Sequence, residues 1–252
     1  MSTALETPSA VPRPAPGLPP DPASFVRVRT TLPRRPLPPN AARPPVLTPR
    51  LVLRPLTLDD LPAVAELRSQ PEVMHWTMLG RVDQDLDETR AKLETFLPPN
   101  DEKTYNFAIC DRETGALIGL GGCHRWGSSF GWPEVGYMIR KEFWGKGLAT
   151  EFLRGFLAAW AGLEREEVEV EVDERTVAGE GVKGVDGLVR EQIIAVTAEG
   201  NGRSQGVLEK AGYEWFVDWL AQDFTKGSGP DSKVLLPTYR HFPGGETGAS
   251  GQ

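Results

Sequence analysis

Apolar and polar residues alternate along several short runs of this chain, and between these runs apolar residues recur with helical spacing. Alternation is typical of half-buried strands, whereas apolar residues three or four positions apart are typical of a helix with one buried face. The alternating runs predict strands over residues 50–56, 105–110, 117–123, 134–139, 168–172, 192–197, 213–223 and 234–242. The helical runs predict helices over residues 58–69, 85–97, 148–163 and 201–212.

The three strands over residues 105–139 follow one another closely, and the turn at 111–115 joins the first two. Short connections of this kind predict an antiparallel meander. Pro237 interrupts the last run, and because proline cannot donate a ladder hydrogen bond, we expect that strand to lie at a sheet edge. The helix over residues 148–163 should bury one apolar face, formed by Phe152, Leu153, Phe156, Leu157 and Trp160.

A glycine-rich stretch opens this helix directly after the strand over residues 134–139. We call residues 144–150, Trp-Gly-Lys-Gly-Leu-Ala-Thr, the glycine loop. Small residues let main-chain N–H groups come close to phosphate oxygens, and the start of a helix adds positive potential. Lys146, Arg140 and Lys141 supply cations nearby. Taken alone, such a loop is equally explained as a tight turn before a helix.

A second motif follows about fifty residues later, where Asn201 precedes Ser204 and the run Val207-Leu-Glu-Lys-Ala-Gly-Tyr213. Together the two motifs resemble the signatures of the GNAT superfamily of acyl-CoA-dependent N-acyltransferases, specifically its RimJ/RimL-type branch. Gly147 and Ala149 match the small positions of the first signature, whereas Trp144 stands where that signature has Arg or Gln. The resemblance covers roughly residues 47–213.

The resemblance implies an α/β fold, a mixed and mostly antiparallel splayed sheet flanked by helices. It implies acetyl-CoA as the co-substrate, with its diphosphate on the glycine loop and its pantetheine along the strand edge near residues 136–139. The residues expected to bind the cofactor are Met138, Ile139, Trp144, Gly145, Lys146, Gly147, Leu148, Ala149, Thr150 and Asn201.

Acyl transfer from a thioester to an amine also needs a base and a group that stabilises the departing thiolate. Glu134 is the first candidate base, because the family places this strand beside the thioester; an ordinary solvated glutamate is the competing interpretation. His124 is the second candidate. Ser204 is the candidate donor to the sulfur, and Asn201 either caps its helix or contacts the cofactor. Many family members have a tyrosine where this chain has Leu208.

Proline content divides the chain, since fourteen of the 23 prolines precede Arg50. We expect residues 1–46 to form a proline-rich disordered arm, residues 47–242 the acyltransferase domain, and residues 243–252 a flexible tail. The family joins its strand directly to the Asn motif, so residues 173–190 are expected to be an insertion. The chain shows no signal-peptide pattern and no membrane-spanning apolar run, which favours a cytoplasmic protein without a membrane partner. A transit peptide is the less favoured alternative, since five arginines lie in a segment of the arm with few acids, namely Arg13, Arg27, Arg29, Arg34 and Arg35.

The net charge of −7 argues against general nucleic-acid binding. Residues 164–191 carry ten acids against four bases, a stretch that is either a solvated acidic surface or a device that attracts a cationic amine. Cys110 and Cys123 have no metal-type spacing, so no metal site is predicted, and both are expected to be small buried residues.

The sequence therefore predicts an N-acetyltransferase that moves an acetyl group from acetyl-CoA directly to a primary amine, either a protein N-terminus or a small molecule. No residue presents itself as a covalent nucleophile, although Cys123 is the one to test. A non-catalytic acyl-CoA-binding module is the alternative, because the missing tyrosine leaves the acid/base set incomplete. The oligomeric state is not encoded in any pattern of the chain.

Overall fold

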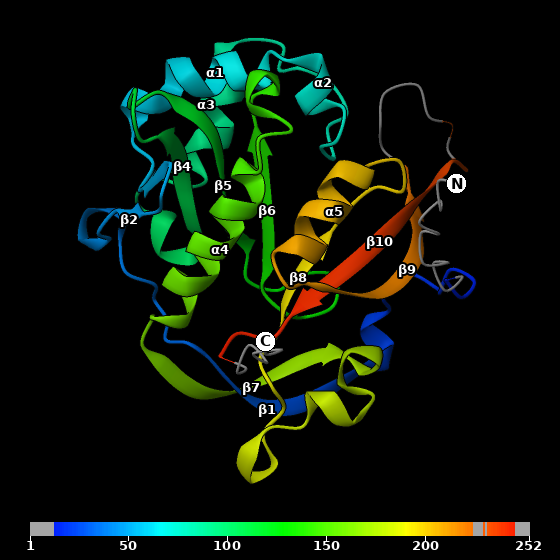
Figure 1. Cartoon of the computed structure of the whole chain (residues 1–252). Coiled ribbons are helices and arrows are strands. Elements are labelled where there is room, and N and C mark those ends of the chain that lie inside the picture. Colours follow the sequence, from blue (N-terminus) through cyan, green and yellow to red (C-terminus); the bar gives the residue numbers. More distant parts are fainter. Residues whose placement is uncertain (1–12, 224–228, 230, 245–252) are drawn as a thin grey trace, which may run out of the picture.

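The computed structural model describes residues 13–223, 229 and 231–244, and the alternating runs form its main sheet. Eight strands lie in the order β2-β3-β4-β5-β6-β8-β10-β9, and every neighbouring pair is antiparallel except β6 and β8 (Figure 1). Their bounds are β2 Val46–Leu47, β3 Leu51–Arg54, β4 Tyr105–Asp111, β5 Leu117–Arg125, β6 Glu134–Ile139, β8 Ile193–Val196, β9 Glu214–Gln222 and β10 Lys233–His241.

The sheet is splayed between β6 and β8. These parallel strands are paired only where Glu134 lies beside Ile194, at the start of β6, and they diverge beyond that point (Figure 1). We call the region between the diverging strands the splay. The mixed, mostly antiparallel splayed sheet expected from the sequence is confirmed.

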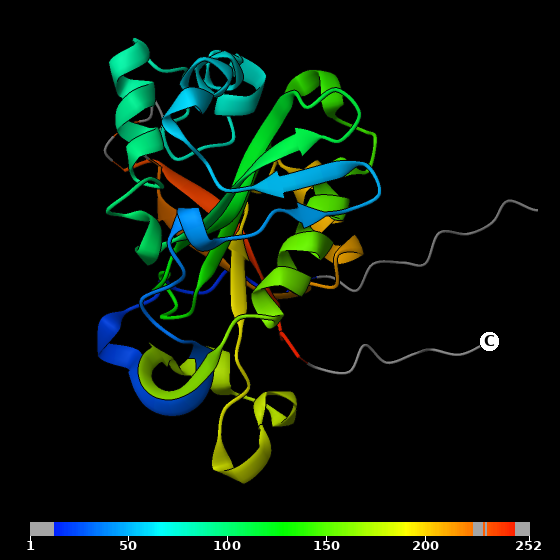
Figure 2. The ribbon, with the colours of Figure 1, turned by 90° about the vertical axis from the view of Figure 1, so that its left-hand side faces the viewer.

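Helices cover both faces of this sheet, as Figure 2 shows from the side. The helices are α1 Leu61–Arg68, α2 Pro71–Met74, α3 Leu86–Glu94, α4 Leu148–Ala161 and α5 Gly202–Lys210, with short 3₁₀ turns at Pro22–Ser24, Asn40–Ala42, Leu58–Asp60, Asp101–Lys103, Lys141–Phe143, Glu174–Val177, Glu180–Val182 and Val185–Gly187. The short helix α2 was not expected from the sequence. The predicted apolar face of α4 is buried.

The two faces of β6 pack against different helices because side chains alternate along a strand. Val135 and Ile139 belong to the core cluster that contains the apolar face of α4 and Leu208 of α5. Met138, one position away, packs instead on the cluster formed by α1 and α3. One face of β6 is therefore the α4/α5 face, and the other is the α1/α3 face.

The expectation of a disordered arm is wrong for the described part of residues 1–46. Residues Phe25–Pro33 form strand β1, which pairs along its whole length with β7, Arg165–Asp173, in a two-stranded antiparallel ribbon outside the main sheet. On β1, Leu32 is buried against Phe130 and Trp132. Apolar burial and cross-strand pairing order a segment whose proline content predicted disorder.

The expected insertion over residues 173–190 forms three 3₁₀ turns, and the carbonyl of Thr176 accepts a hydrogen bond from Gln192 at 2.8 Å. The prediction of β10 as an edge strand is wrong, because β10 lies between β8 and β9. The ladder between β10 and β8 begins at Thr238, so the missing N–H of Pro237 falls just outside it.

Most of the predicted tail lies outside the described residues. Among the helices that the structure describes, none is both long and apolar enough to cross a membrane.

Candidate active site

The glycine loop leads from β6 into α4 with two residues in the left-handed region. Gly145 and Gly147 both have φ of 75°, and Gly147 is the N-cap of α4. Within the described residues, no protein acceptor lies within hydrogen-bond distance of the main-chain N–H groups from Gly145 to Thr150. Trp144 differs from the expectation, because its N–H donates to the carbonyl of Lys141 at 3.1 Å. Six successive donors at a helix start are therefore free for an anion.

Arg50, next to strand β3, fixes the loop from the side. Its Nη1 donates to the carbonyl of Lys146 at 2.9 Å, and its Nε lies 2.7 Å from a carboxylate oxygen of Glu151 in the first turn of α4. The same carboxylate accepts from the main-chain N–H of Arg50 at 2.7 Å. Arg50 thus holds a loop carbonyl turned away from the free N–H groups.

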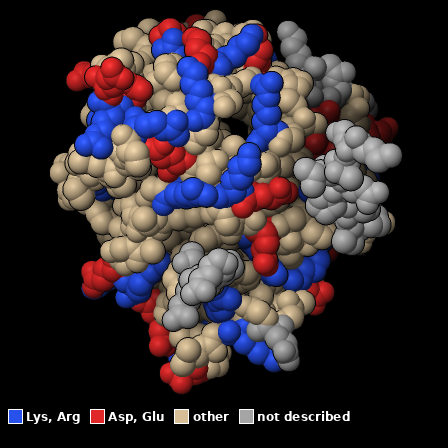
Figure 3. All heavy atoms as spheres, in the orientation of Figure 1, with Lys and Arg blue, Asp and Glu red and all other residues tan. Residues whose placement is uncertain are grey.

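The cations around the loop divide into paired and unpaired groups. Arg140 is paired with Glu66, and Lys141 with Glu72, so these two are not the mobile cations that the sequence suggested. Neither Lys146 nor Arg203 has a carboxylate within ion-pair distance in the described part of the chain, and the Arg203 guanidinium lies 5.3 Å from the ring centroid of Trp144. Figure 3 shows Lys and Arg side chains bordering an opening on this face of the molecule.

The edge of β6 that faces the splay carries the main-chain groups of alternate residues. The N–H of Arg140 donates to Ile118 of β5, so the main-chain groups of even-numbered residues of β6 point to β5 and those of Tyr137 and Ile139 point to the splay. Met138, expected to contact the cofactor, instead pairs with β5 and packs on the α1/α3 face. The indole N–H of Trp144 donates to the carbonyl of Ile139 at 2.7 Å.

The two candidate bases lie together. His124 Nε2 is 3.4 Å from a carboxylate oxygen of Glu134, and the Glu134 side chain is 14% exposed. Glu134 stands where β6 and β8 separate, and strand alternation places it on the same α1/α3 face as Met138. A partly buried carboxylate beside an imidazole can accept a proton from an amine in the splay.

The candidate groups for the thiolate lie on the other face. The side chain of Asn201 caps α5 by accepting from the N–H of Ser204 at 3.2 Å, so its capping role is confirmed, and within the described residues its amide nitrogen has no partner. The Ser204 hydroxyl is 2.9 Å from the Tyr137 hydroxyl. Leu208, at the family's tyrosine position, is 1% exposed and belongs to the core.

Cys123 does not present a nucleophile. Its side chain is 1% exposed, its thiol donates to the carbonyl of Arg125, and burial raises its pKa to about 12. A thiol of that pKa is not ionised at neutral pH. No cluster of residues that could hold a metal ion occurs within the described ranges.

Three of the ten acids of the acidic stretch form ion pairs with arginines of the arm. Three surface ion pairs join β1 and the residue after it to β7 and the residue before it, Arg27–Glu171, Arg29–Glu167 and Arg34–Glu164. Glu191 is paired with Arg165 and accepts from the indole of Trp160 at 2.7 Å. For these four acids, the ion pairs favour a structural role over the attraction of a cationic substrate.

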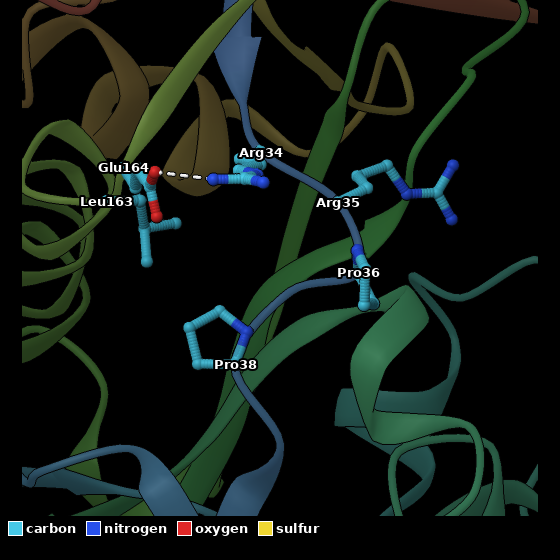
Figure 4. Close-up of a pocket in the computed structure, with 6 residues that line it drawn as sticks. All are labelled: Arg34, Arg35, Pro36, Pro38, Leu163 and Glu164. Carbon is cyan, nitrogen blue, oxygen red and sulfur yellow. Dashed lines mark hydrogen bonds and ion pairs between the residues drawn. The ribbon is translucent and has the colours of Figure 1, made fainter.

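A pocket of about 250 Å³ lies at the opposite end of α4 from the glycine loop (Figure 4). Arg34 and Glu164 meet at its rim at 2.8 Å, and Arg35 points away over the ring of Trp126. None of the residues that line it belongs to either motif, so the pocket is not the candidate site. Its lining residues are Arg34, Arg35, Pro36, Pro38, Leu163 and Glu164.

Comparison with known proteins agrees with this geometry. The family model described as Acetyltransferase (GNAT) domain matches residues 50–214, which is more than half of the chain. The chain belongs to the GNAT acetyltransferase family.

Several known proteins are similar to this GNAT protein in sequence or in fold. The "Uncharacterized N-acetyltransferase p20" of Bacillus licheniformis is 27% identical over 128 residues, which are 50% of this chain and 71% of that protein. The spermidine N-acetyltransferase of Vibrio cholerae, solved with CoA and spermine, has a TM-score of 0.54 at 16% identity, covering 78% of this chain and 97% of that one. RimL, a ribosomal L7/L12 alpha-N-protein acetyltransferase solved with CoA, has a TM-score of 0.54 at 12% identity, covering 79% and 98%.

Sequence reasoning missed three residues of this site. Arg50 precedes the glycine loop by nearly a hundred positions, and no local pattern connects the two. Arg203 lies inside the Asn motif and could have been found by asking which cations share the start of α5. Tyr137 could have been found from strand alternation, because it must face away from Glu134.

Proposed function

We propose that this protein is an acetyl-CoA-dependent N-acetyltransferase of primary amines that transfers the acetyl group directly, without a covalent enzyme intermediate. The observation that carries the proposal is the row of six main-chain N–H groups, from Gly145 to Thr150, that have no hydrogen-bond partner in the described part of the chain. Such donors fit the diphosphate of CoA, and Lys146 and Arg203 add unpaired positive charge beside them. Structural neighbours solved with acetyl-CoA or CoA support this ligand.

In this proposal the base lies on one face of β6, and the hydrogen-bond donor to the sulfur lies on the other. On the α1/α3 face Glu134, with His124 beside it, takes the proton that the attacking amine must lose. On the α4/α5 face Ser204 donates a hydrogen bond to the sulfur as the carbon–sulfur bond breaks. The main-chain groups of Tyr137 and the N–H of Ile139 hold the pantetheine along the edge of the splay.

The acceptor belongs to one of two classes of primary amine. A protein N-terminus is favoured by the RimJ/RimL-type Asn motif and by the RimL neighbour, and a polyamine is favoured by the spermidine N-acetyltransferase neighbour. At these identities the neighbours share the fold alone, so both classes belong in the test. A cytoplasmic location is part of the same proposal.

Two measurements on the full chain test the proposal. Titration calorimetry with acetyl-CoA should show saturable binding, and release of free thiol from acetyl-CoA should rise with either a serine-initiated peptide or spermidine. Intact-mass analysis of the acceptor should show one added acetyl group. Glu134→Gln is the matched control, since it should bind acetyl-CoA normally and release little thiol.

One observation favours a second function, an acyl-CoA-binding module without turnover. Leu208 fills the core where many family members place a general acid. Saturable binding without thiol release across the amine panel would support that module and exclude the acetyltransferase. Absence of binding would exclude both functions.

A further inference from the structure

The contact between Tyr137 and Ser204 links β6 to α5 across the α4/α5 side of the splay. The two hydroxyl oxygens are 2.9 Å apart, and either can be the donor. Among the described residues, Ser204 is the one partner of the Tyr137 hydroxyl. Since Ser204 also has two acceptor lone pairs and one hydrogen, it can accept from Tyr137 while donating elsewhere.

Several neighbours fix the ring of Tyr137 in this position. It packs on Phe152 of α4 with ring centroids 6.0 Å apart. Gly121 lies opposite on β5, and a Cβ there would come within 2.7 Å of the Tyr137 Cβ and 2.8 Å of Phe152. A glycine at this position therefore leaves room for the Tyr137 Cβ and for the Phe152 ring that packs on the tyrosine. The hydroxyl is aimed at α5 by packing rather than by its hydrogen bond alone.

Apart from Ser204, the described residues around the splay offer no hydroxyl that the resemblance places at the sulfur. The position that carries a tyrosine in many family members is Leu208, buried in the core. A single serine hydroxyl is a weak donor, and a second hydroxyl that donates to it polarises the first. Burial raises the pKa of Tyr137 to about 12, so its hydroxyl keeps its hydrogen at neutral pH.

We propose that Tyr137 supports acetyl transfer by donating a hydrogen bond to Ser204, whose own hydroxyl then donates to the sulfur of the departing thiolate. This inference rests on the proposed function. As the carbon–sulfur bond breaks, its electron pair goes to the sulfur, and the two-hydroxyl chain stabilises that negative charge. The neutral amine loses one proton to Glu134, and the thiolate gains one from water. The hydroxide that remains takes the proton from Glu134, so the products are the amide and free CoA thiol and the enzyme is regenerated. Tyr137 acts through Ser204 and is a positioning residue.

Tyr137→Phe keeps the ring and removes the hydroxyl, so it tests the chain with little disturbance of packing. With acetyl-CoA and the amine that the wild-type protein acetylates, kcat should fall roughly tenfold, because Ser204 loses the hydrogen bond that strengthens its own donation to the thiolate. The Kd for acetyl-CoA should stay unchanged. The matched control is Tyr213→Phe, a tyrosine of the core cluster against which Tyr137 packs, whose buried hydroxyl has no partner among the described residues. That variant should keep normal kcat.

A purely structural role for Tyr137 can be distinguished from hydrogen-bond donation by changing only the acidity of its hydroxyl. Replacement with 3-fluorotyrosine and 3,5-difluorotyrosine keeps the shape and strengthens the donor, so kcat should rise along the series at a pH where the hydroxyl is protonated. Tyr137→Phe combined with Ser204→Ala should lose no more kcat than Ser204→Ala alone, since the two hydroxyls act as one unit.

The outcomes are distinguishable. If the wild-type protein acetylates an amine and Tyr137→Phe matches Tyr213→Phe in kcat, the inference is overturned and the proposed function stands. The inference would also be overturned if the losses of kcat in Tyr137→Phe and Ser204→Ala add in the double variant, or if kcat does not change along the fluorotyrosine series. If the wild-type protein transfers acetyl to none of the amines, the proposed function fails and this inference fails with it.

Discussion

The glycine loop and the β1–β7 ribbon both bring charged and main-chain groups together, but over very different distances in sequence. The loop is built within residues 144–150 and the start of its own helix. In the ribbon, Arg27 and Glu171 are separated by 144 positions. The loop could therefore be predicted from its local motif, whereas the ribbon required the fold. In these two regions, the local motif indicates ligand binding and the long-range pairing stabilises the fold.

The ribbon also explains two features of composition at once. The arginines of the arm left a transit peptide as the less favoured alternative, and the acidic stretch was interpreted first as a solvated surface and second as a means of attracting a cationic amine. In the structure the arginines of β1 face the glutamates of β7 across the ribbon. Opposite charges on facing strands favour this register and disfavour others. We therefore expect changes in the ribbon to alter stability, and changes near the loop to alter activity.

Removing the candidate base should have the largest effect on activity. Glu134→Gln keeps the size of the side chain and removes its basicity, so kcat should fall about 100-fold to 1000-fold, in the range of a general base. The Kd for acetyl-CoA should stay within about twofold, because Glu134 lies on the α1/α3 face, away from the loop. Steady-state kinetics and calorimetry measure the two quantities. Unchanged turnover would remove Glu134 from the mechanism.

Truncating a buried side chain of the β1–β7 ribbon should have the largest effect on stability. Leu32 is 2% exposed on β1, and Leu32→Ala should lower the free energy of unfolding by about 2–5 kcal/mol. Urea denaturation measures this change, and acetyl-CoA binding by the folded variant should match the wild type. Arg27→Ala is the exposed control on the same strand, and its expected cost is below about 1 kcal/mol. Equal losses in the two variants would contradict a packed ribbon.

Glu191, the carboxylate that Arg165 of β7 contacts, should make stability depend on pH. Burial raises its pKa from 4.5 to about 7, although Arg165 and Trp160 favour the charged form. The folded state thus binds the proton more tightly than the unfolded state, and the free energy of unfolding should fall as pH rises from 4.5 to 7. A shift of this size corresponds to roughly 3 kcal/mol.

The control for this pH dependence is Glu191→Gln, which cannot ionise. Urea denaturation between pH 5 and 8 should show a flatter profile for the variant than for the wild-type protein. Parallel profiles would show that Glu191 does not carry the dependence.

Of the substitutions considered, Gly147→Val should cause the smallest change in free energy. This change should affect acetyl-CoA binding at the glycine loop and leave the stability of the fold nearly unchanged. Gly147 has φ of 75°, where valine costs about 1–2 kcal/mol, and the loop can relieve that strain by moving. The Kd for acetyl-CoA should therefore rise roughly tenfold, with little change in the urea midpoint. Gly181, also glycine but outside the loop and with open space around it, is the control position. If Gly147→Val binds acetyl-CoA with normal affinity, the expectation that changes in the glycine loop alter binding is wrong.

Much of the fold follows from periodicity in the sequence. The meander β4–β6 and the buried face of α4 were predicted because each depends on nearby residues. β1 was not predicted, because its partner lies far along the chain. The place of β10 was wrong because strand order is set by the whole sheet, and Pro237 only restricts which ladder positions it can occupy.

The candidate site divides in the same way. The glycine loop and the cap by Asn201 are readable from motifs that span a few residues. The hydrogen bond between Tyr137 and Ser204 joins residues 67 positions apart, and Arg50 reaches Lys146 across 96 positions. No local pattern specifies these contacts, because they depend on how β6, β3 and α5 pack.

In the proposed function, the main-chain N–H groups of the glycine loop bind the diphosphate of CoA, and every other role assigned to the site depends on this binding. Its most direct test is amide NMR of the ¹⁵N-labelled full chain, titrated with CoA and, separately, with pantetheine, which lacks the diphosphate. We predict the largest amide shifts at Gly145 and Gly147 with CoA, and little change at either glycine with pantetheine. Unmoved glycine amides at saturating CoA, or equal shifts with both compounds, would contradict the claim.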